Sequence, residues 1–132
     1  MRKEVVLKTS RGRVVIMDSI TKVTPEDEGS IVVAASHGGA SSGEFALDVP
    51  LALVVLNDAG IGKDDAGVAS LAMLQARGVP CATVSHETAR IGDSLDMWQC
   101  GVVSRTNKAA EAFGLHEKQP LREAVSKLIA DR

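Results

Sequence analysis

The chain has 132 residues, of which 24% are charged and 45% are hydrophobic, and its formal net charge is −2. This length suits one domain, residues 1–132, because two independent hydrophobic cores would be hard to build from so few residues. The sequence contains no arginine-rich run or basic stripe, and no apolar stretch is long enough to span a bilayer. We therefore expect a single globular domain with no nucleic-acid partner and no membrane partner.

Two features of the composition bear on location and assembly. Cys81 and Cys100 have no metal-ligand spacing, and the first residues run into a strand pattern rather than a signal peptide. These features predict a cytoplasmic protein whose thiols stay free. The aromatic residues are Phe45, Trp98 and Phe113, so aliphatic side chains must build the core. Because another subunit could supply part of that core, we expect a homo-oligomer.

The first elements are predicted to form an antiparallel hairpin. Residues 4–9 and 13–17 are rich in β-forming side chains, and Gly12 between them supplies the positive φ of a short turn. Further along, residues 31–35 and 51–56 are apolar without alternation. Strands of this kind are covered on both faces, which is typical of a parallel sheet between helices.

Alternating helices and strands complete the predicted fold. We expect helices over 42–48 and 64–77, a strand over 81–85, a helix over 94–100 capped by Asp93 or Ser94, a short strand at 102–103, a helix over 105–113 and a terminal helix opened by Pro120. The pattern predicts an α/β fold. It is a three-layer domain with a mainly parallel, mixed sheet, helices on both faces and an N-terminal antiparallel hairpin.

Three predicted strands end in clusters of glycine and polar residues. The clusters cover residues 36–39, 57–65 and 85–93. Ligands of open α/β sheets bind in the crevice at the carboxyl ends of the parallel strands. Because these strands are expected to be parallel, we predict that the three clusters form one composite site.

The cluster at 57–65 carries the strongest binding signal. Gly60 and Gly62 allow a tight turn whose backbone N–H groups can approach a ligand, and Lys63 adds a positive charge at the start of the expected helix. We predict that a carboxylate or phosphate is bound by Asn57, Gly60, Gly62, Lys63 and Asp64. In the alternative interpretation, Asp64 only caps the helix and Lys63 is solvated.

Known nucleotide-binding motifs do not fit this cluster. A Walker A loop needs Gly at position 57 and Ser or Thr at position 64, whereas the chain has Asn57 and Asp64. The dinucleotide pattern G-x-G-x-x-G begins at Gly60 but ends at Asp65. The sequence therefore favours neither an NTP nor a dinucleotide.

A short stretch of the same cluster carries a family resemblance. Residues 63–67, Lys-Asp-Asp-Ala-Gly, are similar to the Asp-Asp-x-Gly helix start of hydrogenase-maturation endopeptidases. Those enzymes hold a metal with acids and a histidine at strand ends. The resemblance covers about ten residues and implies Asp65 and His86 as metal ligands to be tested.

The segment 37–43 contains two esterase-like strings. Residues 39–43 fit G-x-S-x-G, and His37 with the next two glycines is similar to an oxyanion-hole loop. In α/β-hydrolases these two elements belong to different strands, and this chain is shorter than that fold requires. We instead predict a nest of N–H groups and hydroxyls facing an oxyanion, built from Gly38, Gly39 and Ser41. The alternative is a flexible helix entry with Ser41 or Ser42 as N-cap.

Asp58, His37 and His86 are the predicted proton-transfer residues. Each follows an apolar strand, and a histidine side chain changes its charge near neutral pH. A metal held with Asp58, Glu87 or Asp93 is the alternative. Because no H-x-H or H-E-x-x-H spacing is present, we predict no metal.

Two further residues are predicted to bind ligand in the last cluster. Arg90 can hold a carboxylate with two parallel hydrogen bonds, and Asp93 can orient it. In the alternative interpretation, Arg90 forms a surface pair with Glu87, and Asp93 only caps the next helix.

Three functional hypotheses follow from these residues. The first is an enzyme, such as a hydrolase or lyase, that acts on a small polar, carboxylate-bearing metabolite held by Lys63 and Arg90 and stabilises negative charge with the glycine amides. The second is a non-catalytic domain that binds or senses the same kind of small-molecule ligand. The third is a structural subunit whose loops form an assembly interface. The sequence assigns no cofactor.

Overall fold

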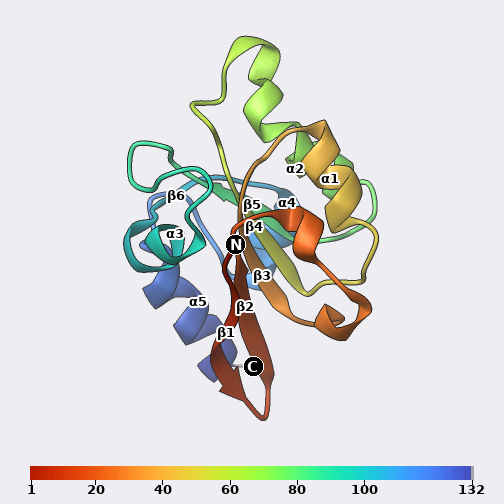
Figure 1. Cartoon of the computed structure of the whole chain (residues 1–132), viewed down its shortest axis with the longest axis vertical. Coiled ribbons are helices and arrows are strands. Elements are labelled where there is room, and N and C mark those ends of the chain that lie inside the picture. Colours follow the sequence, from red (N-terminus) through yellow and green to blue (C-terminus); the bar gives the residue numbers. More distant parts are fainter. Residues whose placement is uncertain (132) are drawn as a thin grey trace.

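A computed structural model describes residues 1–131, which form one six-stranded sheet with helices packed against it (Figure 1). The strands are β1 (Lys3–Thr9), β2 (Gly12–Met17), β3 (Ile31–His37), β4 (Leu53–Asn57), β5 (Cys81–Val84) and β6 (Val103–Thr106). The α-helices are α1 (Ala40–Ala46), α2 (Ala69–Gln75), α3 (Ser94–Cys100), α4 (Lys108–Phe113) and α5 (Leu121–Ala130). Short 3-10 helices lie in the connections, namely η1 (Ile20–Lys22), η2 (Pro25–Asp27) and η3 (Lys63–Val68).

The strands lie in the order β1-β2-β3-β4-β5-β6, so neighbours in sequence are neighbours in the sheet. β1 and β2 form an antiparallel hairpin, β2 to β5 run parallel, and β6 returns antiparallel to β5. The parallel register pairs Val14 with Ile31, Ile31 with Leu53, and Val54 with Cys81. The predicted α/β class, with its mixed sheet and N-terminal hairpin, is confirmed. The carboxyl ends of β2, β3, β4 and β5 therefore meet at one edge.

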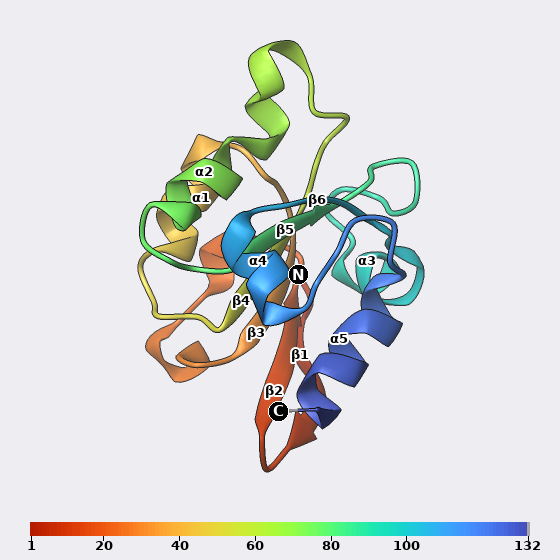
Figure 2. The ribbon, with the colours of Figure 1, turned by 180° about the vertical axis from the view of Figure 1, so that it is seen from behind.

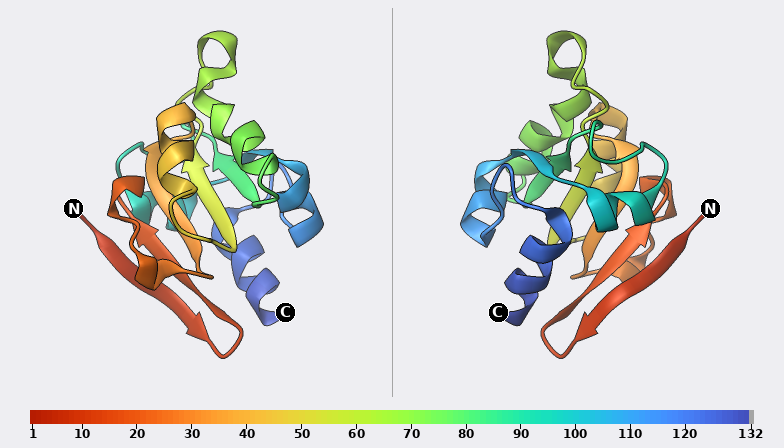
Figure 3. Two further views of the ribbon diagram at one scale, coloured as in Figure 1. Left: turned by 90° about the vertical axis from the view of Figure 1, so that its right-hand side faces the viewer. Right: turned by 90° about the vertical axis from the view of Figure 1, so that its left-hand side faces the viewer.

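Side chains of the buried strands alternate between two hydrophobic clusters. On β2, Val14 and Ile16 belong to one cluster with residues of α3 and α5, whereas Val15 and Met17 belong to another with residues of α1 and α2. Figures 2 and 3 show the same division, with α1 and α2 on one side of the sheet and α3 and α5 on the other. The strands lack polar alternation because both sets of side chains face apolar neighbours.

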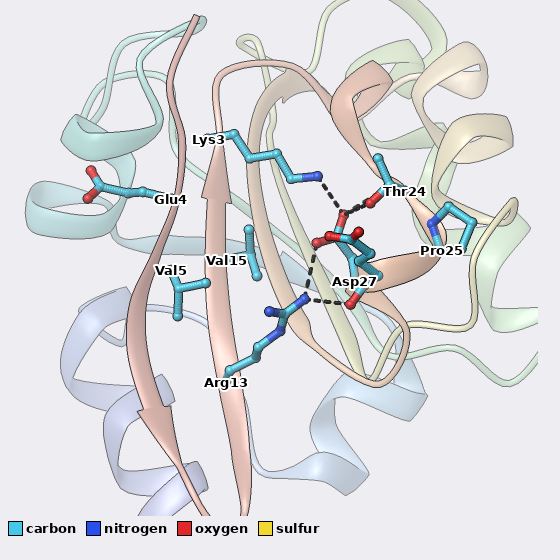
Figure 4. A pocket seen from close by; sticks show the side chains of 9 residues that line it. Lys3, Glu4, Val5, Arg13, Val15, Thr24, Pro25 and Asp27 are labelled. Carbon is cyan, nitrogen blue, oxygen red and sulfur yellow. Dashed lines mark hydrogen bonds and ion pairs between the residues drawn. The ribbon is translucent and has the colours of Figure 1, made fainter.

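The buried carboxylate of Asp27 joins the connection between β2 and β3 to the hairpin (Figure 4). The carboxylate of Asp27 lies 2.9 Å from the Lys3 ammonium and 3.4 Å from a guanidinium nitrogen of Arg13. It also accepts the N–H of Thr24 at 2.8 Å, while Arg13 donates to the hydroxyl of Ser30. Lys3, Arg13, Thr24 and Asp27 line an open pocket of about 640 Å³. Because the charges are paired with one another, we interpret this cluster as one that stabilises the fold rather than one that binds a ligand.

The helix predicted over 64–77 begins later than the sequence indicates. α2 starts at Ala69, and the preceding η3 contains Asp64 and Asp65 with left-handed φ values of 55° and 57°. Asp64 therefore caps no α-helix, and no α-helical N-terminus lies beside Lys63. The partial positive charge that a helix start would add to this loop is displaced to Ala69.

Two other boundaries also differ from prediction. α1 begins at Ala40 and has Gly39 as its N-cap, so neither serine of the loop takes that position. The first residues of the helix predicted over 105–113 instead extend β6, because they pair with β5 up to Thr106. α4 then starts at Lys108. The cap predicted at Asp93 is confirmed, since its side chain accepts the N–H of Asp96.

We expect the side chain of Asn107 to stabilise the packing of β5 and α4 against each other. Its buried Oδ1 accepts the N–H groups of Cys81 and Ala110 at 3.1 and 2.8 Å, and its Nδ2 donates to two backbone carbonyls in and after α2. Asn107→Ala leaves these buried groups unpaired and removes a helix cap. We expect urea denaturation to show a loss of about 2–4 kcal/mol in the free energy of unfolding. The exposed Lys108→Ala is the control, and an equal effect of both variants would contradict this assignment.

Candidate functional site

The polar ends of three parallel strands lie side by side, as the topology requires. His37 at the end of β3 pairs in register with Asn57 of β4, which pairs with Val84 of β5. Asp58 follows directly on β4, and His86 lies two residues beyond β5. The three clusters predicted from the sequence therefore share one edge of the sheet.

Asn57 is fully buried and ties two loops to the central strand. Its Oδ1 accepts the N–H of Ala59 at 2.9 Å, and its Nδ2 donates to the carbonyl of Ala89 at 3.1 Å. Both ends of the side chain are thus used within the protein. The role that the structure gives Asn57 is to fix the loops after β4 and β5, rather than the ligand binding predicted for it.

Asp58 is the buried acid of the site, with 3% of its surface exposed. Its Oδ1 accepts the N–H of Gly60 at 2.8 Å and the N–H of His86 at 3.0 Å. Burial acts to raise the pKa of this carboxyl, but hydrogen bonds from Gly60, Ser104 and His86, with the charge of His86, outweigh burial and lower the pKa. Asp58 is therefore a carboxylate at neutral pH.

The imidazole of His86 lies against this carboxylate and is half-exposed. Its Nδ1 is 3.4 Å from Asp58 Oδ1, and 49% of the side chain is accessible to solvent. A carboxylate can only accept a hydrogen bond, so it favours the proton on the Nδ1 that faces it. The Nε2 of His86 is then left with a free lone pair, which is the arrangement of a general base.

His37 has the opposite arrangement. Its Nδ1 accepts the N–H of Gly39 at 3.0 Å and lies 3.5 Å from the hydroxyl of Ser42. An Nδ1 that accepts a hydrogen bond carries no proton, so the neutral ring carries its proton on Nε2. The exposed His37 therefore presents a hydrogen-bond donor, whereas His86 presents an acceptor.

The glycine amides do not form the open nest expected from the sequence. The N–H of Gly38 donates to the carbonyl of Asn57, and the N–H of Gly39 donates to His37. The N–H of Gly60 donates to Asp58, and that of Gly62 donates to the carbonyl of Gly60. All four amides donate within the protein, so they are not free to stabilise an anion.

The charged residues Lys63, Asp64 and Arg90 near the edge are exposed. Within residues 1–131, the side chains of Lys63 and Arg90 form no ion pair. Asp93 caps α3 and does not orient Arg90, whose backbone N–H donates to Asp96 at 2.9 Å. The exposed Asp64 lies in the left-handed part of η3. Lys63 and Arg90 are therefore cations that remain available to a ligand. The hydroxyl of Ser41, four residues after His37, is also exposed.

The loop after β4 has a strained backbone. Four of its non-glycine residues have positive φ, including the β-branched Ile61 at 67°. The loop returns to the strand end at Gly67, where a Cβ atom would lie only 2.1 Å from the carbonyl oxygen of Asp58. A side chain at position 67 would therefore push the loop away from Asp58.

A shallow pocket of about 490 Å³ opens between this loop and the start of α1. Its walls are mostly aliphatic, and His37 provides the one side chain with hydrogen-bonding groups among the lining residues His37, Gly39, Ala40, Ala59, Ile61, Ala66, Gly67 and Ile91. This lining differs from the anion-binding character that the sequence predicts for the whole crevice.

One acidic residue at this edge was missed from the sequence. Asp18 follows β2, which is also parallel to β3, and accepts the N–H and hydroxyl of Ser94 at 3.0 and 2.7 Å and the N–H of Arg2 at 2.7 Å. Burial acts to raise its pKa, but these hydrogen bonds lower it overall. The signal was a carboxylate directly after the apolar run 14–17, the same signal that identified Asp58 after β4.

Within the described residues 1–131, no group of three or more His, Cys, Asp or Glu side chains could hold a metal ion. Asp65, implied as a ligand by the short endopeptidase resemblance, is exposed. In the same part of the chain, no helix is long and apolar enough to cross a membrane. Comparisons with known protein families, with curated proteins and with solved structures found no match to this chain.

The lowered pKa of Asp58 makes part of the stability depend on pH. In the unfolded chain this carboxyl titrates near 3.8, and in the folded chain it titrates lower, so its contribution is present above pH 3.8 and is lost as the pH falls through the folded pKa. We therefore expect the gap in unfolding free energy between wild type and Asp58→Asn to narrow below about pH 4 in urea titrations. The exposed Asp48→Asn is the control. A gap that stays constant with pH would contradict this prediction.

Proposed function

We propose that this protein is an enzyme that acts on a small polar, carboxylate-bearing metabolite at the carboxyl edge of its parallel strands. The observation that carries the proposal is the pairing of a buried, ionised Asp58 with a half-exposed His86. Such pairs are typical of proton transfer, because the carboxylate holds one ring nitrogen and leaves the other as a base.

The Asp58–His86 pair supports a specific chemical role. When Nε2 of His86 takes a proton, the ring becomes a cation and the adjacent carboxylate stabilises that charge. The two backbone N–H groups on Asp58 Oδ1 hold the acid in place, so the pair needs little rearrangement during the reaction. Asp58 is then a positioning residue, and His86 is the group that touches the substrate.

The two available cations support a carboxylate on the substrate. Lys63 lies two residues after Ile61, and Arg90 directly precedes Ile91. Both isoleucines line the shallow pocket, so the two cations flank it along the chain. The glycine amides already donate hydrogen bonds within the protein. Lys63 and Arg90 therefore supply the positive charge for the carboxylate without the help of the backbone that the sequence predicts.

A screen for ligands followed by turnover tests this proposal. Small carboxylates that raise the melting temperature of the wild-type protein would be incubated with it in D₂O, and NMR would follow product formation or deuterium exchange into the ligand. We expect His86→Gln to reduce the rate roughly 10²–10⁴-fold while binding is kept, because the variant lacks the base. The exposed His116→Gln, outside the three strand-end clusters, is the matched control and is expected to keep the rate.

The outcomes separate the three functional hypotheses. Stabilising ligands with no product and no exchange in the wild type would overturn the enzyme and favour a non-catalytic binding domain. Turnover that is equal in wild type and His86→Gln would overturn the assigned base. A screen without any stabilising carboxylate would overturn the substrate class and favour the structural subunit.

A further inference from the structure

We infer that the shallow pocket beside His37 takes an uncharged, carbonyl-bearing aliphatic part of the ligand, with the Nε2–H of His37 as the hydrogen-bond donor to the carbonyl oxygen. The inference rests on the proposed function for the existence of a small-molecule ligand. It adds the substrate class, which is a short aliphatic oxo acid rather than a phosphate or a dicarboxylate.

The tautomer of His37 determines what this residue can bind. Its Nδ1 receives the Gly39 N–H, and the Ser42 hydroxyl lies close to the same atom. The neutral ring of His37, which lines the pocket, therefore has its hydrogen-bond donor at Nε2–H. A donor of this kind pairs with a neutral carbonyl oxygen, whereas a ligand N–H or O–H donor would find no acceptor on the ring.

The remaining wall of the pocket gives little to a charged group. The side chains are those of alanine and isoleucine, and the N–H groups of Gly39, Ile61 and Gly67 already donate within the protein at 2.7 to 3.0 Å. A carboxylate or phosphate placed against this wall would lose part of its hydration without gaining a paired charge, which is unfavourable. The wall therefore favours an apolar group, and the charged end of the ligand must remain outside.

The size and surroundings of the pocket limit the ligand further. Its volume of about 490 Å³ lies in the lower part of the range of ligand pockets, so it has room for a short chain. Ile91, 53% exposed, gains most from being covered by an aliphatic chain. Lys63 and Arg90 are close in sequence to the lining residues Ile61 and Ile91, and we assign them to the carboxylate end of the ligand, as in the proposed function.

Three probes of equal chain length test this inference. They are pentanoate, which has only the carboxylate, pentan-2-one, which has only the carbonyl, and 4-oxopentanoate, which has both. Titrations followed by ¹H–¹⁵N NMR would give each dissociation constant and show whether the amides of His37, Ile61 and Ile91 shift. We expect 4-oxopentanoate to bind about fivefold more tightly than pentanoate, the effect of one neutral hydrogen bond.

Variants separate the carbonyl from the carboxylate. His37→Phe removes the donor and is expected to abolish the fivefold preference, whereas His37→Gln keeps an N–H donor and retains part of it. Lys63→Ala is expected to weaken pentanoate and 4-oxopentanoate equally and to leave their ratio unchanged. As a check that does not depend on a variant, pentan-2-one is expected to shift the Nε2 resonance of His37 in the wild type.

Each result bears on either the inference or the proposed function. No preference for 4-oxopentanoate, a preference that survives His37→Phe, or no shift of the pocket amides by pentan-2-one would overturn the inference. If Lys63→Ala and Arg90→Ala leave pentanoate binding unchanged while the His37-dependent preference remains, the carboxylate-binding role that the proposed function gives these two cations is wrong and the inference stands.

Discussion

The edge of the sheet that carries the candidate site depends on one buried oxygen. Oδ1 of Asp58 accepts N–H groups from Gly60 and from His86, which belong to the loops after β4 and β5. Asn57 repeats the arrangement one residue earlier, with bonds to the same two loops. Without these acceptors, the turns would lose hydrogen bonds that each contribute about 0.5–1.5 kcal/mol, and more where the acceptor is charged. The position of His86, and hence any chemistry at this edge, follows from this anchoring.

Much of the fold could be predicted from the sequence because its signals are local. The unbroken apolar runs of β3 and β4 indicate strands covered on both faces, and Gly12 marks the turn of the hairpin. The shared edge of Asp58 and His86 follows from the parallel arrangement of the strands. β6 was placed less well, since Val103–Thr106 takes its extended form from pairing with β5, a contact distant in sequence.

The detailed chemistry of the site could not be predicted in the same way. Gly38 and Gly60 have the freedom expected of anion-binding loops, but which acceptor their amides meet is decided by contacts with Asn57 and Asp58. In this protein, the glycine amides therefore hold the loops against β4 instead of binding an anion. The start of α2 at Ala69 has a similar cause, because the strained loop returns to β4 through Gly67 before a helix can form. Tertiary contacts overrode both local patterns.

The central claim is that Asp58 sets the protonation of His86, and ¹⁵N NMR of the histidine side chains tests it most directly. In the neutral imidazole, the account predicts that His86 carries its proton on Nδ1 and has a bare Nε2. His37 is expected to show the reverse in the same spectrum and serves as an internal reference. A proton found on Nε2 of His86 would mean that the carboxylate does not orient the ring, and it would contradict the account.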